Sequence, residues 1–89
     1  MKVIDLLTVL EGHIEIKVYQ DPIKEIDPYS MLPVERFRGT TRTARNSNQN
    51  YLNFEVYKVD ISAPGFIDIF CRADAKQMQS IIRAHKEGR

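Results

Sequence analysis

Residues 51–71 read YLNFEVYKVDISAPGFIDIFC, and this stretch decides the fold. β-Branched and aromatic residues dominate on both sides of the segment Ala63-Pro64-Gly65. Proline presets φ at about −65°, and glycine accepts the positive φ that the next position of a type II turn requires. Two such runs joined by a short turn form a β-hairpin, and we expect the remaining elements to pack on the sheet that contains it.

Apolar residues alternate along the first arm of this hairpin, but the alternation slips. They occupy one parity as far as Val56 and the other parity from Tyr57 to Ile61. A β-bulge near Tyr57-Lys58 would reconcile the two halves, and so would burial on both faces. In the second arm, Cys71 shares a parity with two isoleucines. We therefore expect it inside the core, as a small apolar residue rather than a nucleophile.

Two helices and another strand are expected around the hairpin. Residues 2–11 place apolar side chains at i, i+3, i+4 and i+7, which is the period of a helix, and Gly12 is its expected end. Residues 13–19 alternate apolar and polar side chains, which predicts a half-buried strand. Asp74 is an expected N-cap for a closing helix over residues 74–87.

A proline-rich stretch, residues 21–35, shows neither period and is expected to form a long ordered loop. Its apolar residues are Ile23, Ile26, Tyr29, Met31, Leu32 and Val34. These side chains either cover an open edge of the core or form a binding surface, with Tyr29 and Leu32 as apolar anchors. Covering the core is the expected use, because so small a domain needs most of its apolar groups.

Residues 35–45 are predicted to form a strand, and its arginines give this part of the chain a local positive charge. The arginines of this window are Arg36, Arg38, Arg42 and Arg45. No acid lies between Glu35 and Glu55, so the window carries +4 while the rest of the chain nets −3. An extended backbone would place the first three arginines on one face. Such a row of guanidinium groups could bind the phosphates of a nucleotide or nucleic acid, or an acidic groove on a protein.

The same arginines also have a purely structural interpretation, which we favour. Arginines on exposed strands commonly cover apolar neighbours with their stems and pair with carboxylates on adjacent strands. Glu15, Glu55 and Asp68 could supply such carboxylates. The sequence also lacks the aromatic and basic motifs of an RNA-recognition sheet.

Size and composition restrict the function. Eighty-nine residues predict a single domain over residues 1–89, and a net charge of +1 provides no global attraction to nucleic acid or an anionic membrane. The single cysteine excludes an intrachain disulfide and is typical of a reducing compartment. The sequence shows neither a signal-peptide pattern nor an apolar run of membrane-spanning length. We therefore expect a cytoplasmic protein without membrane association.

Catalysis and metal binding have little support in the sequence. The only obvious candidates for a nucleophile and a base are Cys71, His13 and His85, and each has an ordinary structural interpretation. The acids of the loop do not follow the ligand spacing of a calcium site. We expect no catalytic residues, no metal site and no cofactor.

Four segments carry a resemblance to a known group of proteins. They are KVIDLLTVLEG (2–12), HIEIKVYQD (13–21), FRGT (37–40) and FIDIFC (66–71). In this layout the chain resembles small uncharacterised proteins of phages and prophages in Gram-positive bacteria. The resemblance implies an accessory or inhibitory viral protein, acting in the host cytoplasm against a defence system by binding a protein or a nucleotide signal. It implies no catalytic residues.

These observations predict an α+β fold: an antiparallel sheet of about four strands, including a three-stranded meander, with the N- and C-terminal helices packed on one face. The predicted function is a non-enzymatic binding module that occludes a host protein or sequesters a ligand. The alternative is nucleotide or nucleic-acid binding through Arg36–Arg45. Exposed sheet edges also predict self-association.

Overall fold

A computed structural model describes residues 1–10, 13–63 and 65–88, so the predicted helix end at Gly12 and the turn residue Pro64 lie outside the described residues. The elements are α1 (Val3–Val9), β1 (Glu15–Gln20), β2 (Val34–Thr40), α2 (Thr41–Arg45), the 3₁₀ helix η1 (Asn50–Asn53), β3 (Glu55–Ala63), β4 (Phe66–Arg72) and α3 (Ala75–Glu87).

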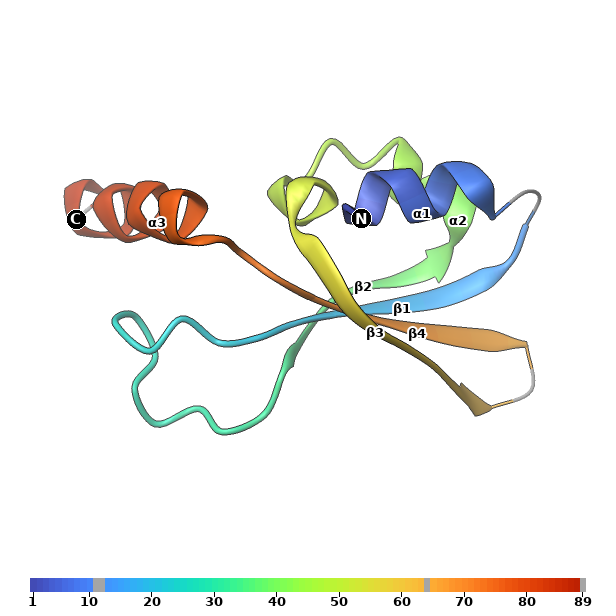
Figure 1. Ribbon diagram of the computed structural model, residues 1–89, viewed down its shortest axis with the longest axis horizontal. Coiled ribbons are helices and arrows are strands. Elements are labelled where there is room, and N and C mark those ends of the chain that lie inside the picture. The colour runs from blue at the N-terminus through green and yellow to red at the C-terminus, as the bar shows by residue number, and fades with distance from the viewer. Residues whose placement is uncertain (11–12, 64, 89) are drawn as a thin grey trace.

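The strands form one mixed sheet in the order β2-β1-β4-β3 (Figure 1). β1 pairs antiparallel with β2 but parallel with β4, and β4 pairs antiparallel with β3. The predicted α+β class with four strands is confirmed, whereas the purely antiparallel sheet and the meander are wrong. The reason is that β1, whose Ile16 and Val18 are fully buried, lies in the centre of the sheet between β2 and β4.

The β3–β4 hairpin confirms the interpretation of residues 51–71, with one change at its start. Gly65 has φ +89°, the positive value expected of it. The register shifts between Val56 and Lys58, which confirms the predicted bulge. The strand begins at Glu55 rather than at Tyr51, because the chain first forms η1.

The predicted strand over residues 35–45 is wrong in its second half. β2 ends at Thr40, whose hydroxyl accepts a hydrogen bond from the backbone N–H of Thr43 at 3.3 Å and so caps α2. α2 and η1 then carry the chain across the sheet to β3 at the opposite edge (Figure 1). β2 and β3 are therefore not neighbours in the sheet, as the expected three-stranded meander would require.

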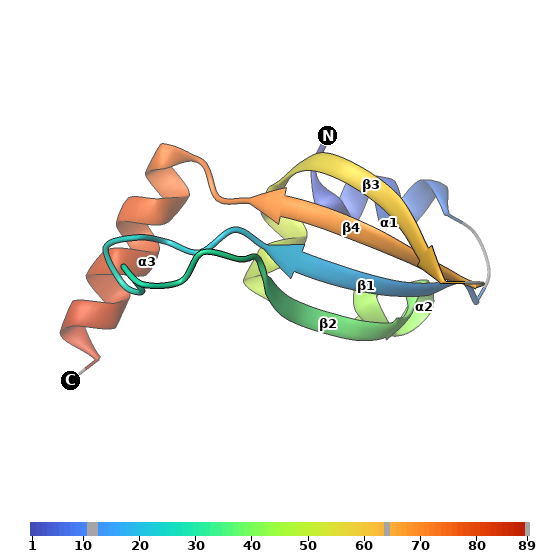
Figure 2. The same cartoon turned by 90° about the horizontal axis from the view of Figure 1, so that it is seen from below.

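The core lies between the sheet and α1, α2 and η1, which all lie on the same side of it (Figure 1). Its buried apolar residues are Val3, Leu7, Ile16, Val18, Ala44, Tyr51, Leu52, Phe54, Ile69, Cys71 and Ala73. The predicted inward position of Cys71 is confirmed. Figure 2 shows the opposite face of the sheet, over which none of the described helices lies.

α3 lies beyond the ends of the strands rather than over the sheet, unlike the expected packing of both terminal helices on one face (Figures 1 and 2). Asp74 and Gln77 form a capping box at its start, which confirms Asp74 as the predicted N-cap. None of its described residues is fully buried. Met78 and Ile81 are half-buried against the core and connect this helix to the domain.

Candidate functional site

The predicted row of arginines does not form, because a bulge and a helix separate its members. β2 carries an extra residue between the partners of Val18 and Tyr19, and this residue is Arg36. Its guanidinium donates hydrogen bonds to Gln20 Oε1 and, at 3.1 Å, to Asn50 Oδ1 of η1. Arg36 therefore reaches toward the side of the sheet that the helices cover.

Arg38 lies on the opposite, uncovered face, where its neighbour in the sheet is Lys17 of β1. It donates to Glu35 Oε1 at 2.8 Å, and both side chains are exposed. This hydrogen bond lowers the pKa of the Glu35 carboxyl and raises the pKa of the Arg38 guanidinium. The pair is solvated and contributes little to stability.

The other two arginines belong to α2. Arg45 donates to the backbone carbonyl of Leu7 at 2.9 Å and to that of Leu10 at 3.4 Å, at the C-terminal end of α1. Arg42 is exposed. Three of the four guanidinium groups thus bind acceptors within the chain, on different sides of the molecule. These arginines therefore do not form the expected common face for binding anions.

The loop between β1 and β2 exposes the other predicted anchors. Tyr29 is 92% exposed, Met31 82% and Leu32 75%, and Val34 at the start of β2 is also exposed. The expectation that these side chains cover the core is therefore wrong for the loop tip. Monomeric proteins rarely expose so many large apolar side chains within six residues, and such clusters mark interaction sites. We call Tyr29, Met31, Leu32 and Val34 the apolar loop surface.

The base of the loop is anchored, which holds the tip in place. Ile23 is buried, and its carbonyl accepts hydrogen bonds from the N–H groups of Ile26 and Asp27 at 3.0 and 2.9 Å. Lys24 Nζ donates to the carbonyl of Ser30 at 2.7 Å and bridges the loop. Of the apolar residues in this loop, Ile23 is buried and Ile26 is half-buried, but neither belongs to the cluster of core residues.

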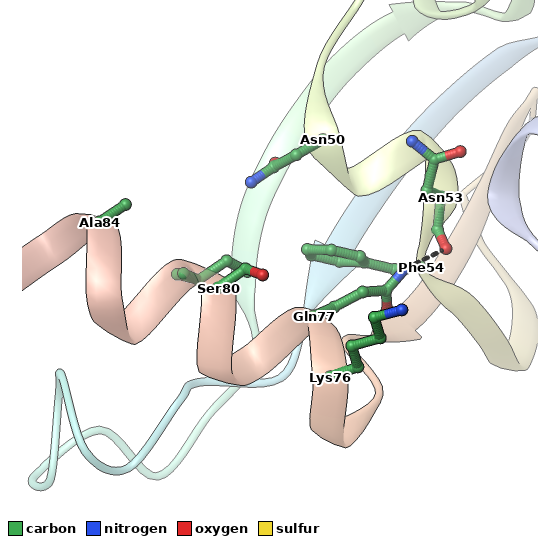
Figure 3. Close-up of a pocket in the computed structure, with 8 residues that line it drawn as sticks. Asn50, Asn53, Phe54, Lys76, Gln77, Ser80 and Ala84 are labelled. Carbon is green, nitrogen blue, oxygen red and sulfur yellow. Dashed lines mark hydrogen bonds between the residues drawn. The ribbon is translucent and has the colours of Figure 1, made fainter.

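A groove between η1 and α3 was not predicted (Figure 3). It has a volume of about 410 Å³, and its lining residues are Asn50, Asn53, Phe54, Lys76, Gln77, Ser80, Ile81 and Ala84. Gln77 spans the groove at one end by donating to the carbonyl of Asn53 at 2.9 Å. Its apolar lining on the side of α3 comes from Ile81 and Ala84.

The uncovered face of the sheet carries a row of aromatic rings that sequence analysis also missed. The rings of Tyr19 and Phe70 stack at 5.1 Å, and Tyr57 follows at 6.3 Å from Phe70. The Arg72 guanidinium lies 4.0 Å from the Tyr57 ring, and Lys58 Nζ lies 5.2 Å from the Phe70 ring. Residues of three strands build this row, so only the sheet order brings it together.

Carboxylates balance the cations of this face. Asp68 is only 6% exposed and is flanked in the sheet by Lys17 on one side and Asp60 on the other. One of its carboxylate oxygens has no hydrogen-bond partner among the described residues. Because Asp68 and Asp60 accompany the cations on this face, the aromatic row lacks the positive field that a nucleic-acid-binding sheet requires.

The three candidates for catalysis do not converge. His13 precedes β1 at the end of the sheet that is far from α3, whereas His85 lies in the last turn of α3 (Figure 1). Cys71 is fully buried. Within the described ranges, no three histidine, cysteine, aspartate or glutamate side chains group as metal ligands would.

We expect Cys71 to be inert in the folded protein. Burial raises the pKa of its thiol from 9.0 to about 11, and its Sγ lies 3.4 Å from the carbonyl oxygen of Tyr19. A disulfide reagent at pH 8 should react at least about 100-fold more slowly with the folded chain than with the chain in denaturant. Equal rates in the two conditions would show that the thiol is accessible.

Of the helices in the described ranges, none has the length and hydropathy needed to cross a membrane. Comparison of the chain with protein-family models, curated proteins and solved structures gave no significant match.

Proposed function

We propose that this chain is a small non-enzymatic binding module whose contact site for a partner protein is the apolar loop surface. The exposure of Tyr29, Met31 and Leu32 on an anchored loop is the observation that carries the proposal. Burying one such side chain in an interface contributes roughly 1.5–3 kcal/mol. Because the loop base is already ordered, little conformational entropy remains to be lost on binding.

The charges around the loop indicate the chemistry of this partner. Residues 21–35 contain four acids and one lysine. Asp21 and Glu35 form ion pairs with Arg72 and Arg38, whereas Glu25 and Asp27 are exposed carboxylates of the loop. A protein with an apolar cleft and a basic rim is complementary to it, whereas a phosphate backbone is repelled. The alternative, nucleotide or nucleic-acid binding through Arg36–Arg45, has less support because three of those arginines bind acceptors within the chain.

The biological role that we propose follows from the resemblance to small phage and prophage proteins. In that role the module is an accessory or inhibitory protein that occludes a surface of a host protein in the cytoplasm. A loop that inserts apolar anchors into a cleft suits such occlusion, because the cleft is then closed to its normal ligand.

A comparison of captured proteins tests the loop. The immobilised chain should retain a stoichiometric host protein, and the Tyr29→Ala/Leu32→Ala variant should bind that protein at least about 30-fold more weakly, since central apolar anchors dominate interfaces. Binding should also persist in high salt, because the contact is mainly apolar. Titration calorimetry with the purified captured protein measures both effects.

Two variants provide the controls. Tyr29→Phe keeps the ring and should bind as the native chain does, while Arg38→Ala/Arg42→Ala tests the arginine alternative without disturbing buried contacts. Loss of binding in the arginine variant, with full binding by the loop variant, would contradict the proposal and favour an anionic ligand. A steep fall of affinity with salt would do the same.

A further inference from the structure

One edge of the sheet is open and apolar. β3 is an edge strand, and its Val59 and Ile61 are 51% and 72% exposed. At its start, the N-terminal segment covers the outer side: Val56 N–H donates to the Met1 carbonyl at 2.8 Å, and Lys2 forms a bridge with Glu55. From residue 57 to residue 61, none of the described strands lies on that side.

The charges along this open segment are arranged on one face. Lys58 and Asp60 pair across the sheet with Phe70 and Asp68, so both point to the uncovered face. Val59 pairs with Ile69 and points to the other face. The carboxylate of Asp60 accepts a hydrogen bond from the N–H of its own neighbour in the chain, at 2.8 Å, and is exposed.

This segment is complementary to itself in one antiparallel register. In a two-fold pair centred on Val59, Lys58 of each copy lies opposite Asp60 of the other, and the two valines are opposite each other. Opposite charges directly across two strands are favourable. Ile61, which is 72% exposed, follows Asp60 in each copy and lies opposite residue 57 of the other copy in this register.

The neighbouring registers are unfavourable. Centring the pair on Lys58 places two lysines opposite each other, and centring it on Asp60 places two aspartates opposite each other. A shift by a single residue between the two strands sets opposite faces against each other, which the pleat of a sheet does not allow. The charges thus select the register centred on Val59.

The other edge of the sheet opposes self-pairing. β2 contains Arg36, Phe37 and Arg38 at its centre. A two-fold pair centred on either arginine places that residue opposite itself, and the bulge at Arg36 interrupts the edge that a second copy would need. β3 is therefore the edge at which a second copy fits.

We propose that two copies of this chain associate through β3, over residues 57–61, to form a continuous eight-stranded sheet. The dimer is closed by its two-fold axis, and the five-residue pairing ends where the N-terminal segment covers β3. Main-chain hydrogen bonds provide the attraction, and Lys58 and Asp60 set the register. A dimer presents the apolar loop surface twice, although this inference does not depend on the function proposed for that surface.

Sedimentation equilibrium of charge-reversal variants tests this dimer. The mass of the native chain should rise from 10.3 kDa toward twice that value between about 10 μM and about 1 mM. Lys58→Asp and Asp60→Lys each place like charges opposite each other twice in the two-fold pair. Each should weaken dimerisation roughly tenfold or more.

Mixing the two variants restores the complementarity. In a Lys58→Asp chain paired with an Asp60→Lys chain, each lysine again lies opposite an aspartate. The equimolar mixture should therefore dimerise more strongly than either variant alone. The double variant Lys58→Asp/Asp60→Lys should also dimerise. Lys86→Asp on α3 makes the same change of net charge as Lys58→Asp but should leave dimerisation unchanged.

Three results would overturn the proposal. One is a native chain that stays at 10.3 kDa over the whole concentration range. Another is a single variant that dimerises as the native chain does. The third is an equimolar mixture that stays monomeric while the native chain dimerises. Circular dichroism of each variant shows whether it is folded. If one single variant does not fold, the double variant still tests the register.

Discussion

Replacing Tyr51 with alanine is expected to lower the free energy of unfolding by about 3–5 kcal/mol. Tyr51 is the largest of the fully buried side chains, and its ring lies 6.3 Å from that of Phe37. It belongs to η1, so its removal opens a cavity between the sheet and the segment that crosses it. A domain of this size has about 5–9 kcal/mol in total. The Tyr51→Ala variant should therefore be only marginally stable, and the midpoint of its unfolding should lie at a low urea concentration.

Tyr29→Ala is the matched control, because it deletes the same side chain from a fully solvated site. We expect a change of at most about 0.5 kcal/mol from it. If the two substitutions were equally destabilising, or if Tyr51→Ala were neutral, the core described above would be wrong. Tyr51→Phe, which keeps the ring, should lose only about 0.5–1.5 kcal/mol with the hydroxyl contact to Ser47 at 3.2 Å.

The hydroxyl of Tyr51 also predicts a pH dependence. Burial raises the pKa of this phenol above its ordinary value of 10.0, so the folded state binds the proton more tightly than the unfolded state does. Its contribution to stability is therefore fully present below pH 10.0 and is lost as the pH rises through the higher folded value. Tyr51→Phe should accordingly show a shallower loss of stability than the native chain as the pH rises above 10.0.

Local pattern was sufficient for the elements whose residues interact with near neighbours in the chain. The β3–β4 hairpin, the positive φ of Gly65 and the Asp74 cap depend on contacts within a few residues, and all were predicted. The bulge at Tyr57 was one of two explanations for the change of parity within this strand, and the register shift between Val56 and Lys58 shows that it is present.

Strand order depends on distant contacts and could not be predicted in this way. The parallel pair β1–β4 joins Ile16 to Ile67, and no pattern in either strand records its direction. The error over residues 41–45 has a similar cause. Threonine and arginine in that window suit an exposed strand, but Thr41 and Ala44 are fully buried, which favours the short helix α2 beneath α1.

The candidate site, too, could be predicted from the sequence only in part. Exposure of Tyr29 and Leu32 was one of two alternatives in the sequence, and only the folded chain, in which both side chains are exposed, decides between them. The arginine row failed because it assumed one continuous strand. A bulge at Arg36 and a cap at Thr40 each change the direction of the side chains that follow, and neither is visible without the pairing of β1 with β2.

The arginine that contributes most to stability is expected to be Arg45, which the sequence placed in an anion-binding window. Its guanidinium donates to the carbonyls of Leu7 and Leu10 at the C-terminal end of α1, and the last carbonyls of a helix need partners other than those within the helix. A cation at this end also complements the helix dipole. Arg45→Ala should therefore lower the free energy of unfolding by about 1.5–3 kcal/mol.

Arg42→Ala provides a control in the same helix, with the same change in charge and helix propensity. Because Arg42 is exposed, we expect a change of at most about 0.5 kcal/mol. Urea unfolding of the two variants side by side measures the difference. The cost of Arg45→Ala should also persist in high salt, since its hydrogen bonds are partly buried and therefore weakly screened. If the two variants were equally stable, Arg45 would be a surface cation like Arg42, and it would be available again for binding an anion.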